Sequence, residues 1–394
     1  MKIITRILIA SFITWFAFAE KLIADPFSQV NLRAGLISAL QHHPLILDFY
    51  TENDYELIWF GNNALASQRR AELVNSLQSA SFHGLPGKKY QVNSLLSKLS
   101  TSDSLFEIGL LEGLFMIAFT EYASDLDTGV LIPSEVDSDI VRHINNKDTD
   151  FYIQGLLSRN PYDYFRSLGP QSSEYARLLV EYQKLSEIIR NGAWSNIATD
   201  RILRFGDSGD DVVAIRNRLF DQGYMPNSIS TKFDKNLLKA IQKYQSDHGL
   251  IPDGIVGEGT ILELNITAEQ RLSSIIVALE RERWLGDTLG QRHIWVNLAD
   301  FTAKIIEDHA VVFETRTVLG VNDDSMRSPE FSDKMEYMVV NPTWHIPVSI
   351  AKNEYLPELK KDPEALPFLK LFDSSGSLVD RESIDFSILG KNYF

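Results

Sequence analysis

Nucleophilic, acid–base and metal chemistry depend on a few residue types, and this sequence supplies them unevenly. Its 394 residues include 53 Asp plus Glu and 8 His but no Cys, which excludes disulfides, thiolate zinc sites and cysteine nucleophiles within this chain. Paired carboxylates could hydrolyse a glycan by acid–base catalysis. However, Asp207, Asp210 and Asp211 fit the acidic start of a helix, and Asp323-Asp324 fits a solvated loop. A carboxylate-based hydrolase is therefore a weak interpretation.

The histidines show no spacing typical of metal ligands or of a catalytic base. His42-His43 has no spaced carboxylate or thiol partner, so it does not indicate a metal site. His248 precedes Gly249 at the predicted end of a helix, where a positive charge would be favourable. His345 fits a surface or lid position better than a catalytic one. We therefore expect no metal and no cofactor.

Length and composition limit what can position these residues. A chain of 394 residues should contain two or three domains. Its hydrophobic share of 44% and charged share of 23% are typical of a globular protein. The net charge of −15, without a basic patch, would repel phosphate backbones, so we expect no nucleic-acid partner.

The first 19 residues have the three parts of a secretory signal peptide. Lys2 and Arg6 precede an apolar run from Ile7 to Ala19, which closes on Ala17-Phe18-Ala19. The run is shorter than the ~20 residues that span a bilayer. We expect cleavage after Ala19 and a periplasmic or exported protein, with membrane contact only if this segment is retained.

Residues 27–194 are predicted to form an all-α domain. Apolar residues recur at helical spacing from Leu65 to Leu77, and the segment from Ser104 to Leu126 is the densest apolar stretch. That segment should form the core helix of the domain. A final helix from Ser172 to Arg190 is predicted to stop at Asn191-Gly192.

Residues 203–264 form the clearest module, which we predict as three helices. The first, from Gly209 to Gln222, is amphipathic. The second is capped by Asp234 and closed by Gly249, and the third begins at Gly257.

The order of glycines, caps and apolar positions in this module resembles a known family of peptidoglycan-binding domains. Most of the matching residues are structural in that family, so the resemblance implies a fold and a partner, peptidoglycan, through its glycan strands or stem peptides. An unrelated three-helix bundle is the alternative. The motif residues are Gly206, Gly209, Gly223, Phe233, Asp234, Tyr244, Gly249, Asp253, Gly254, Gly257 and Thr260.

Beyond a helix predicted from Ala268 to Arg283, the sequence changes to the alternation typical of strands. Glu307-Asp308-His309 fits a hairpin connection between two of them. The predicted strands cover residues 294–298, 303–305, 311–317 and 336–340.

Three short pieces in this region are specific: Phe331-Ser332-Asp333-Lys334-Met335, Asn341-Pro342-Thr343-Trp344 and Pro347-Val348-Ser349-Ile350-Ala351. They resemble the start of an L,D-transpeptidase catalytic domain of the YkuD type, in its large periplasmic subgroup. His83-Gly84-Leu85 and Tyr122-Ala123-Ser124-Asp125-Leu126 also resemble the scaffold domain of that subgroup.

The resemblance implies a multidomain α+β protein with four segments. A signal peptide covers residues 1–19, an all-α scaffold domain covers 27–194, and a three-helix peptidoglycan-binding domain covers 203–264. Residues 292–394 are predicted to form an incomplete, β-rich YkuD-like domain with a lid. The lid should comprise residues 350–363 and 366–385, packed down by Leu356, Leu359 and Leu366.

The resemblance also implies a cysteine enzyme that crosslinks peptidoglycan. In the family, a thiolate activated by a His attacks the amide after the third residue of a stem tetrapeptide and releases D-Ala. The side-chain amine of a diaminopimelate on another stem then attacks the thioester, which makes a 3→3 crosslink. The family's late His and Ser-x-Gly-Cys motifs do not occur in this sequence. We therefore assign no catalytic residue and expect no turnover from the chain as written.

Two interpretations follow besides the hydrolase. The favoured one is a C-terminally truncated transpeptidase, and the alternative is a non-catalytic module that binds peptidoglycan and scaffolds partners. By resemblance, Trp344 borders the substrate groove, although a core position explains a Trp there equally well.

Overall fold

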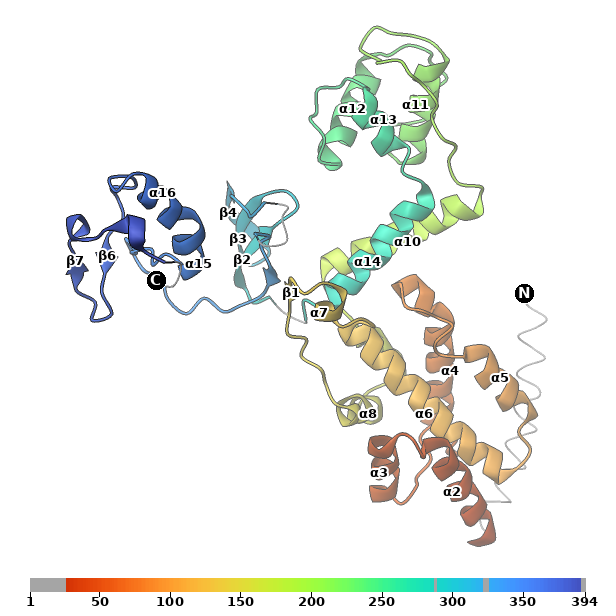
Figure 1. Cartoon of the computed structure of the whole chain (residues 1–394). Coiled ribbons are helices and arrows are strands. Elements are labelled where there is room, and N and C mark those ends of the chain that lie inside the picture. Colours follow the sequence, from red (N-terminus) through yellow and green to blue (C-terminus); the bar gives the residue numbers. More distant parts are fainter. Residues whose placement is uncertain (1–25, 287–288, 322–325, 391–394) are drawn as a thin grey trace. The chain divides into compact units, whose positions relative to one another are not determined.

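The computed structural model describes residues 26–286, 289–321 and 326–390 (Figure 1). The predicted signal peptide and Asp323-Asp324 lie outside the described residues. The chain divides into two compact units, residues 1–332 and 333–394, each with its own buried apolar cluster. Helices dominate the first unit, which also contains a three-stranded antiparallel sheet. The protein is thus a multidomain α+β protein, as predicted.

Helix α6 (Leu105–Thr128) is the core helix of the N-terminal helical domain, as its apolar sequence predicts. A capping box fixes its start: Ser104 Oγ accepts from the Glu107 N–H at 3.3 Å, and the Glu107 carboxylate accepts from the Ser104 N–H at 3.2 Å. The other elements of the domain are α2 (Pro26–Leu40), α3 (Pro44–Glu52), α4 (Ala64–Ser79), a 3-10 turn (Ala80–His83), α5 (Val92–Thr101), α7 (Pro133–Val136), β1 (Ile140–Val141), α8 (Thr149–Ser158) and α9 (Pro161–Ser167).

Helices α2 and α6 lie side by side with their backbones in contact (Figure 1). A Cβ atom at Gly109 would lie 1.9 Å from the carbonyl oxygen of Leu32, and one at Gly35 would lie 1.9 Å from the carbonyl oxygen of Phe106. No side chain fits at such distances, so both crossing points require glycine.

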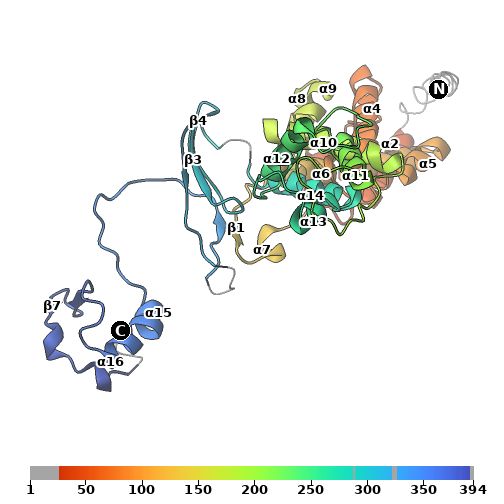
Figure 2. The same ribbon diagram turned by 90° about the horizontal axis from the view of Figure 1, so that it is seen from above.

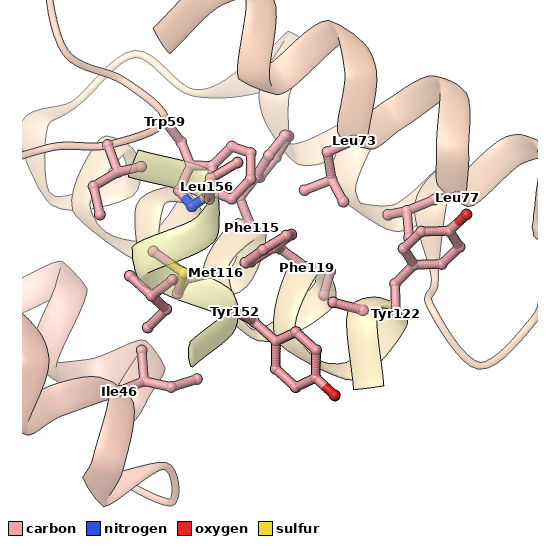
Figure 3. Packing of buried hydrophobic residues seen from close by; sticks show 14 of the residues in the cluster. Ile46, Trp59, Leu73, Leu77, Phe115, Met116, Phe119, Tyr122, Tyr152 and Leu156 are labelled. Carbon is pink, nitrogen blue, oxygen red and sulfur yellow. The ribbon is translucent and has the colours of Figure 1, made fainter. Parts of the chain in front are cut away.

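Aromatic rings fill the interior of the helical domain around α6 (Figure 3). The Trp59 ring is fully buried, with its centroid 5.6 Å from that of Phe119 and 6.1 Å from that of Phe115. Leu73 and Leu77 of α4 belong to the same cluster. This core holds the loop before α4 against α6.

Glu112 is a carboxylate inside this apolar core, and it is 0% exposed. It accepts a hydrogen bond from the Tyr50 hydroxyl at 2.6 Å. It also accepts from the backbone N–H groups of Ile58 at 2.7 Å and Phe60 at 2.9 Å. Burial raises the pKa of Glu112, while these hydrogen bonds act in the opposite direction. The carboxylate therefore fixes the segment that places Trp59 in the core.

Helices α10 (Ser173–Arg190) and α14 (Ala268–Arg283) form an antiparallel pair. The Ser172 hydroxyl, at the start of α10, donates to a carboxylate oxygen of Glu282 near the end of α14 at 3.0 Å. The three-helix module is the stretch of chain between these two helices. Its helices are α11 (Asp210–Asp221), α12 (Lys235–Asp247) and α13 (Glu258–Leu264), as predicted.

The antiparallel sheet consists of β2 (Arg292–Asn297), β3 (Thr302–Glu307) and β4 (Ala310–Arg316), in that order. Strands β3 and β4 lie side by side in both views (Figure 1 and Figure 2). Asp308 and His309 connect them with φ values of 47° and 66°, which is the conformation of a tight two-residue hairpin. The predicted hairpin is thus confirmed.

The strand predicted at Glu336–Val340 is wrong. This segment has no regular secondary structure, and Val340 is 80% exposed. Alternating apolar residues form a strand only where a neighbouring strand accepts their hydrogen bonds, and no described strand pairs with them. The short strand in this region is instead β5 (Glu330–Phe331), which pairs in parallel with β1.

The unit formed by residues 333–394 has a small apolar core. Leu356 and Leu359 of α16 (Leu356–Lys361) are buried with Phe386, and Leu366 packs against them, as predicted for the lid. Arg381 donates hydrogen bonds to the carbonyl groups of Pro363 and Leu366. The remaining elements are α15 (Val348–Ile350), a π turn (Ala351–Tyr355), β6 (Leu371–Phe372), β7 (Leu378–Val379) and 3-10 turns at Arg381–Ser383 and Phe386–Ile388.

Candidate functional site

Most motif glycines of the three-helix module lie where the backbone turns through positive φ. A side chain is strained in this conformation, so the positions favour glycine. At Gly254 a Cβ atom would also meet Leu238 Cδ1 at 2.3 Å. Gly257 differs, because it caps α13 with a φ of −96°. The positive φ values are 97° at Gly206, 133° at Gly209, 79° at Gly223, 70° at Gly249 and 74° at Gly254.

Asp234 joins two helices of the module. Its carboxylate caps α12 by accepting from the Leu237 N–H at 2.9 Å, and it forms an ion pair of 2.6 Å with the buried Arg216 of α11. These contacts lower the pKa of Asp234, and the hydrogen bond from Leu237 has the largest effect. Phe233 is buried directly before the cap. The sequence indicated the cap but not the ion pair with α11.

Gln245 organises the turn that leads into α13. Its Oε1 accepts from the Gly254 N–H at 2.9 Å, and its Nε2 lies 3.1 Å from both Asp253 Oδ1 and Thr260 Oγ1. Gln245 is only 1% exposed, so this buried amide is satisfied by the turn. Asp253, Gly254 and Thr260 therefore have structural contacts in the module.

Tyr244 and His248 stack at the end of α12, with ring centroids 4.0 Å apart. The Tyr244 hydroxyl accepts from Arg271 at 3.0 Å. Burial lowers the pKa of His248, which disfavours the charged form expected at this helix end. The partial burial of the stacked ring thus opposes a charge on His248, while the contact of its Nδ1 with the Tyr244 carbonyl oxygen at 2.7 Å favours one.

The scaffold-like motifs of the helical domain hold helix α14. The Glu280 carboxylate accepts from the backbone N–H groups of Val130 at 2.6 Å and Leu131 at 2.8 Å. Arg283 is 1% exposed, pairs with Glu280 at 2.9 Å and donates to the carbonyl oxygen of His83. The sequence suggested these motifs but did not indicate that α14 is their partner. The separations are 150 residues for Val130 and Glu280 and 200 residues for His83 and Arg283.

His83 lies within the same contact. Its ring stacks on Tyr175, and its Nδ1 lies 3.0 Å from the Tyr175 hydroxyl. Burial and the charge of Arg283 lower the pKa of His83 to about 4. The imidazole is therefore neutral at physiological pH.

Ion pairs hold the segment that carries β5. Arg327 pairs with Asp137 at 3.2 Å and Asp139 at 3.3 Å. Glu330 pairs with Arg281 and, at 3.5 Å, with Arg142. The end of the first unit is thus tied to both α14 and the strand β1.

Trp344 lies in the second unit, in a stretch without regular secondary structure. Its side chain is 61% exposed and makes no hydrogen bond or ring contact with the residues that the structure describes. The core position considered for this Trp is not observed. His345 lies in the same exposed stretch.

Across the described ranges, no group of three or more Asp, Glu or His side chains could hold a metal ion. None of the helices within those ranges combines the length and apolarity that a membrane crossing needs.

Three family models match successive parts of the chain. Residues 44–181 match a scaffold domain, residues 208–264 match a "putative peptidoglycan binding domain", and residues 291–379 match an L,D-transpeptidase catalytic domain. The catalytic-domain match covers β2, β3 and β4 of the sheet and part of the second unit. Residues 291–379 are thus similar to the catalytic domain of L,D-transpeptidases, and residues 208–264 are similar to a peptidoglycan-binding domain.

Two curated proteins are similar to parts of the chain. A Haemophilus influenzae protein named "Putative L,D-transpeptidase" is 29% identical over 102 residues, which are 25% of this chain and 20% of that protein. A Kitasatospora aureofaciens protein named "Uncharacterized protein in bpoA1 3'region" is 37% identical over 73 residues, 18% of this chain and 62% of that protein. The matched part thus spans about a fifth of the length of the first relative.

Proposed function

We propose that this protein binds peptidoglycan in the periplasm or outside the cell and takes part in L,D-transpeptidation, the formation of 3→3 crosslinks between stem peptides. One observation carries the proposal. Helix α14 leaves the peptidoglycan-binding module, is held by the helical domain through Glu280 and Arg283, and leads to β2 of the catalytic-domain segment. The wall-binding module and the catalytic-domain segment therefore lie on either side, in the chain, of one helix that the helical domain holds.

We also propose a division of the chain. Residues 1–19 are a signal peptide, 27–194 the scaffold, 203–264 the peptidoglycan-binding domain, and 292–394 the part of the catalytic domain that includes the lid. Trp344 is the proposed substrate-groove residue, because an exposed Trp offers a flat apolar face to a sugar ring or stem peptide.

The chain's own residues bind and position the substrate in this proposal. Acyl transfer in this family needs a thiolate, and no residue of the 394 is a cysteine. We infer that the polypeptide of this sequence does not itself form the acyl-enzyme. A non-catalytic scaffold on peptidoglycan is the second candidate, which the same lack of a thiol favours.

Co-sedimentation with purified peptidoglycan sacculi tests the binding. We expect the full chain to sediment with sacculi and Gly254→Val to remain in the supernatant, because the added side chain would collide with Leu238 and disrupt the module. Gly257→Ala is the matched control, since nothing lies within 4 Å of a Cβ there. Equal sedimentation of both variants would contradict a role for the module.

Intact mass spectrometry after incubation with a carbapenem tests the second part of the proposal. Carbapenems acylate the catalytic thiol of this family, so we expect no mass increase. A stoichiometric covalent adduct on this polypeptide would show that another nucleophile is present and would refute the assignment.

A further inference from the structure

The helical domain contains a solvent-open groove of about 400 Å³ that the functions above leave unassigned. The turn between α2 and α3, one face of α6, and the start of α8 line it. Its volume lies within the range of small-ligand sites. The lining side chains that can bind a ligand by charge or hydrogen bond include His42, His43, Lys89, Glu121, Asp125 and Thr149.

Asp125 is a preorganised acceptor in this groove. It is 7% exposed, and its Oδ2 accepts from Lys89 Nζ at 2.6 Å and from the Tyr90 hydroxyl at 2.8 Å. Both donors contact the same oxygen. In the described part of the chain, Oδ1 has no hydrogen-bond partner, so it can accept from a ligand without any side chain moving.

Glu121 lies one helical turn before Asp125, so the two carboxylates share one face of α6. No ion pair or hydrogen bond joins Glu121 to another described residue. Lys89 balances only one of the two negative charges. The face therefore has one uncompensated carboxylate, which favours a ligand with an amine.

A positive charge, that of Lys89, lies beside these two carboxylates. The Lys89 ammonium uses one of its three N–H groups on Asp125, and the His42 imidazole makes no hydrogen bond, ion pair or ring contact with a described residue. Both can donate to a carboxylate. The groove therefore suits a small ligand that carries an amine and a carboxylate close together.

We propose that this groove binds the stem peptide of peptidoglycan, with its free side-chain amine at Glu121 and Asp125 and a carboxylate at Lys89 and His42. The inference rests on the proposed function and gives the protein a second peptidoglycan contact, separate from the three-helix module. A glycan strand without stem peptides would leave Glu121 without a charged partner, so it is not the ligand of this groove.

Isothermal titration of the full chain with a soluble disaccharide-tetrapeptide tests the proposal, with diaminopimelate as the third residue of the stem. Glu121→Gln should weaken binding roughly tenfold, which is the scale of one charged hydrogen bond. Acetylating the amine of the peptide should weaken wild-type binding at least as much and should cost clearly less in Glu121→Gln, where only the contact with Asp125 remains to be lost. Glu187→Gln, an exposed residue of α10 without a described ion pair, is the matched control.

Acylation of Lys89 by a water-soluble reagent, followed by peptide mass spectrometry, locates the ligand. The tetrapeptide should protect Lys89 at least several-fold, whereas a glycan free of peptide should not. If Glu121→Gln binds like wild type and Lys89 is not protected, the groove proposal is overturned. If the wild-type protein still sediments with sacculi in that case, the proposed function stands. If it neither binds the tetrapeptide nor sediments with sacculi, the groove proposal and the proposed function are both refuted.

Discussion

At the scale of single residues, buried polar groups in this protein join segments that are distant in the sequence. Glu112 fixes the segment of Trp59, and Glu280 with Arg283 fixes α14. Each such group makes several hydrogen bonds that offset its desolvation, although Arg283 Nε has no partner among the described residues. Removing one partner leaves the other buried and unpaired, which costs more than the contact itself contributes.

His83 should make the folded state less stable in acid. Its pKa of about 4 in the fold lies below the 6.5 of an exposed imidazole, so between pH 6.5 and 4 the unfolded chain binds the extra proton. The contribution of the neutral His83 to the free energy of unfolding is complete above pH 6.5, and it falls by up to about 3 kcal/mol towards pH 4.

Urea unfolding of wild type and His83→Asn across this pH range measures the effect. The difference in unfolding free energy should grow with pH from 4 to 6.5 and then level off, because the other groups that titrate in this range are common to both proteins. His143→Asn, at an exposed His, is the control variant. A flat difference for His83→Asn would contradict the depressed pKa.

At the scale of elements, close helix packing depends on glycine, and Gly109→Ala should be strongly destabilising. The new methyl group would lie 1.9 Å from a carbonyl oxygen of α2, so the two helix backbones must separate. Overpacking of this kind costs about 1–3 kcal/mol or more. Gly87→Ala, where the nearest atom is 3.9 Å away, should be near neutral. Equal denaturation midpoints for the two variants would show that α2 and α6 do not pack backbone to backbone.

The elements that sequence could predict are those with local signals. The periodicity of Leu65–Leu77 and the apolar run from Ser104 found α4 and α6, and the Asp308-His309 hairpin has its own turn chemistry. The pairing of β1 with β5 was missed because two-residue strands carry no periodicity. Glu336–Val340 was mistaken for a strand because a short apolar run records hydrophobicity, not the presence of a pairing partner.

The candidate site was predictable to a similar degree. The motif glycines and the Asp234 cap follow from turn and helix-cap preferences. The ion pair of Asp234 with Arg216 joins α12 to α11. The hydrogen bond from the Val130 N–H to Glu280 joins the helical domain to α14, 150 residues away. Their partners depend on the tertiary fold, which no local pattern encodes.

At the scale of the whole molecule, the contact of α14 with the helical domain should set how the first unit is arranged. Arg283 is buried and bridges Glu280, the His83 carbonyl and the Tyr175 hydroxyl. Arg283→Met keeps much of the volume but leaves Glu280 and these oxygens without their cation. We expect α14 to be released from the helical domain while each part stays folded, because no core residue of either is changed.

The lack of native cysteines makes this release measurable. Ser97→Cys on α5 and Ser273→Cys on α14, both exposed, would carry the only two spin labels, and electron paramagnetic resonance would give the distribution of distances between them. The distribution should be narrow in the background protein and should broaden with Arg283→Met. Arg177→Met, which breaks an exposed ion pair with Glu174 on α10, should leave it narrow. Unchanged width with Arg283→Met would mean that the buried arginine does not hold α14, and that the wall-binding module and the catalytic segment are coupled by other contacts.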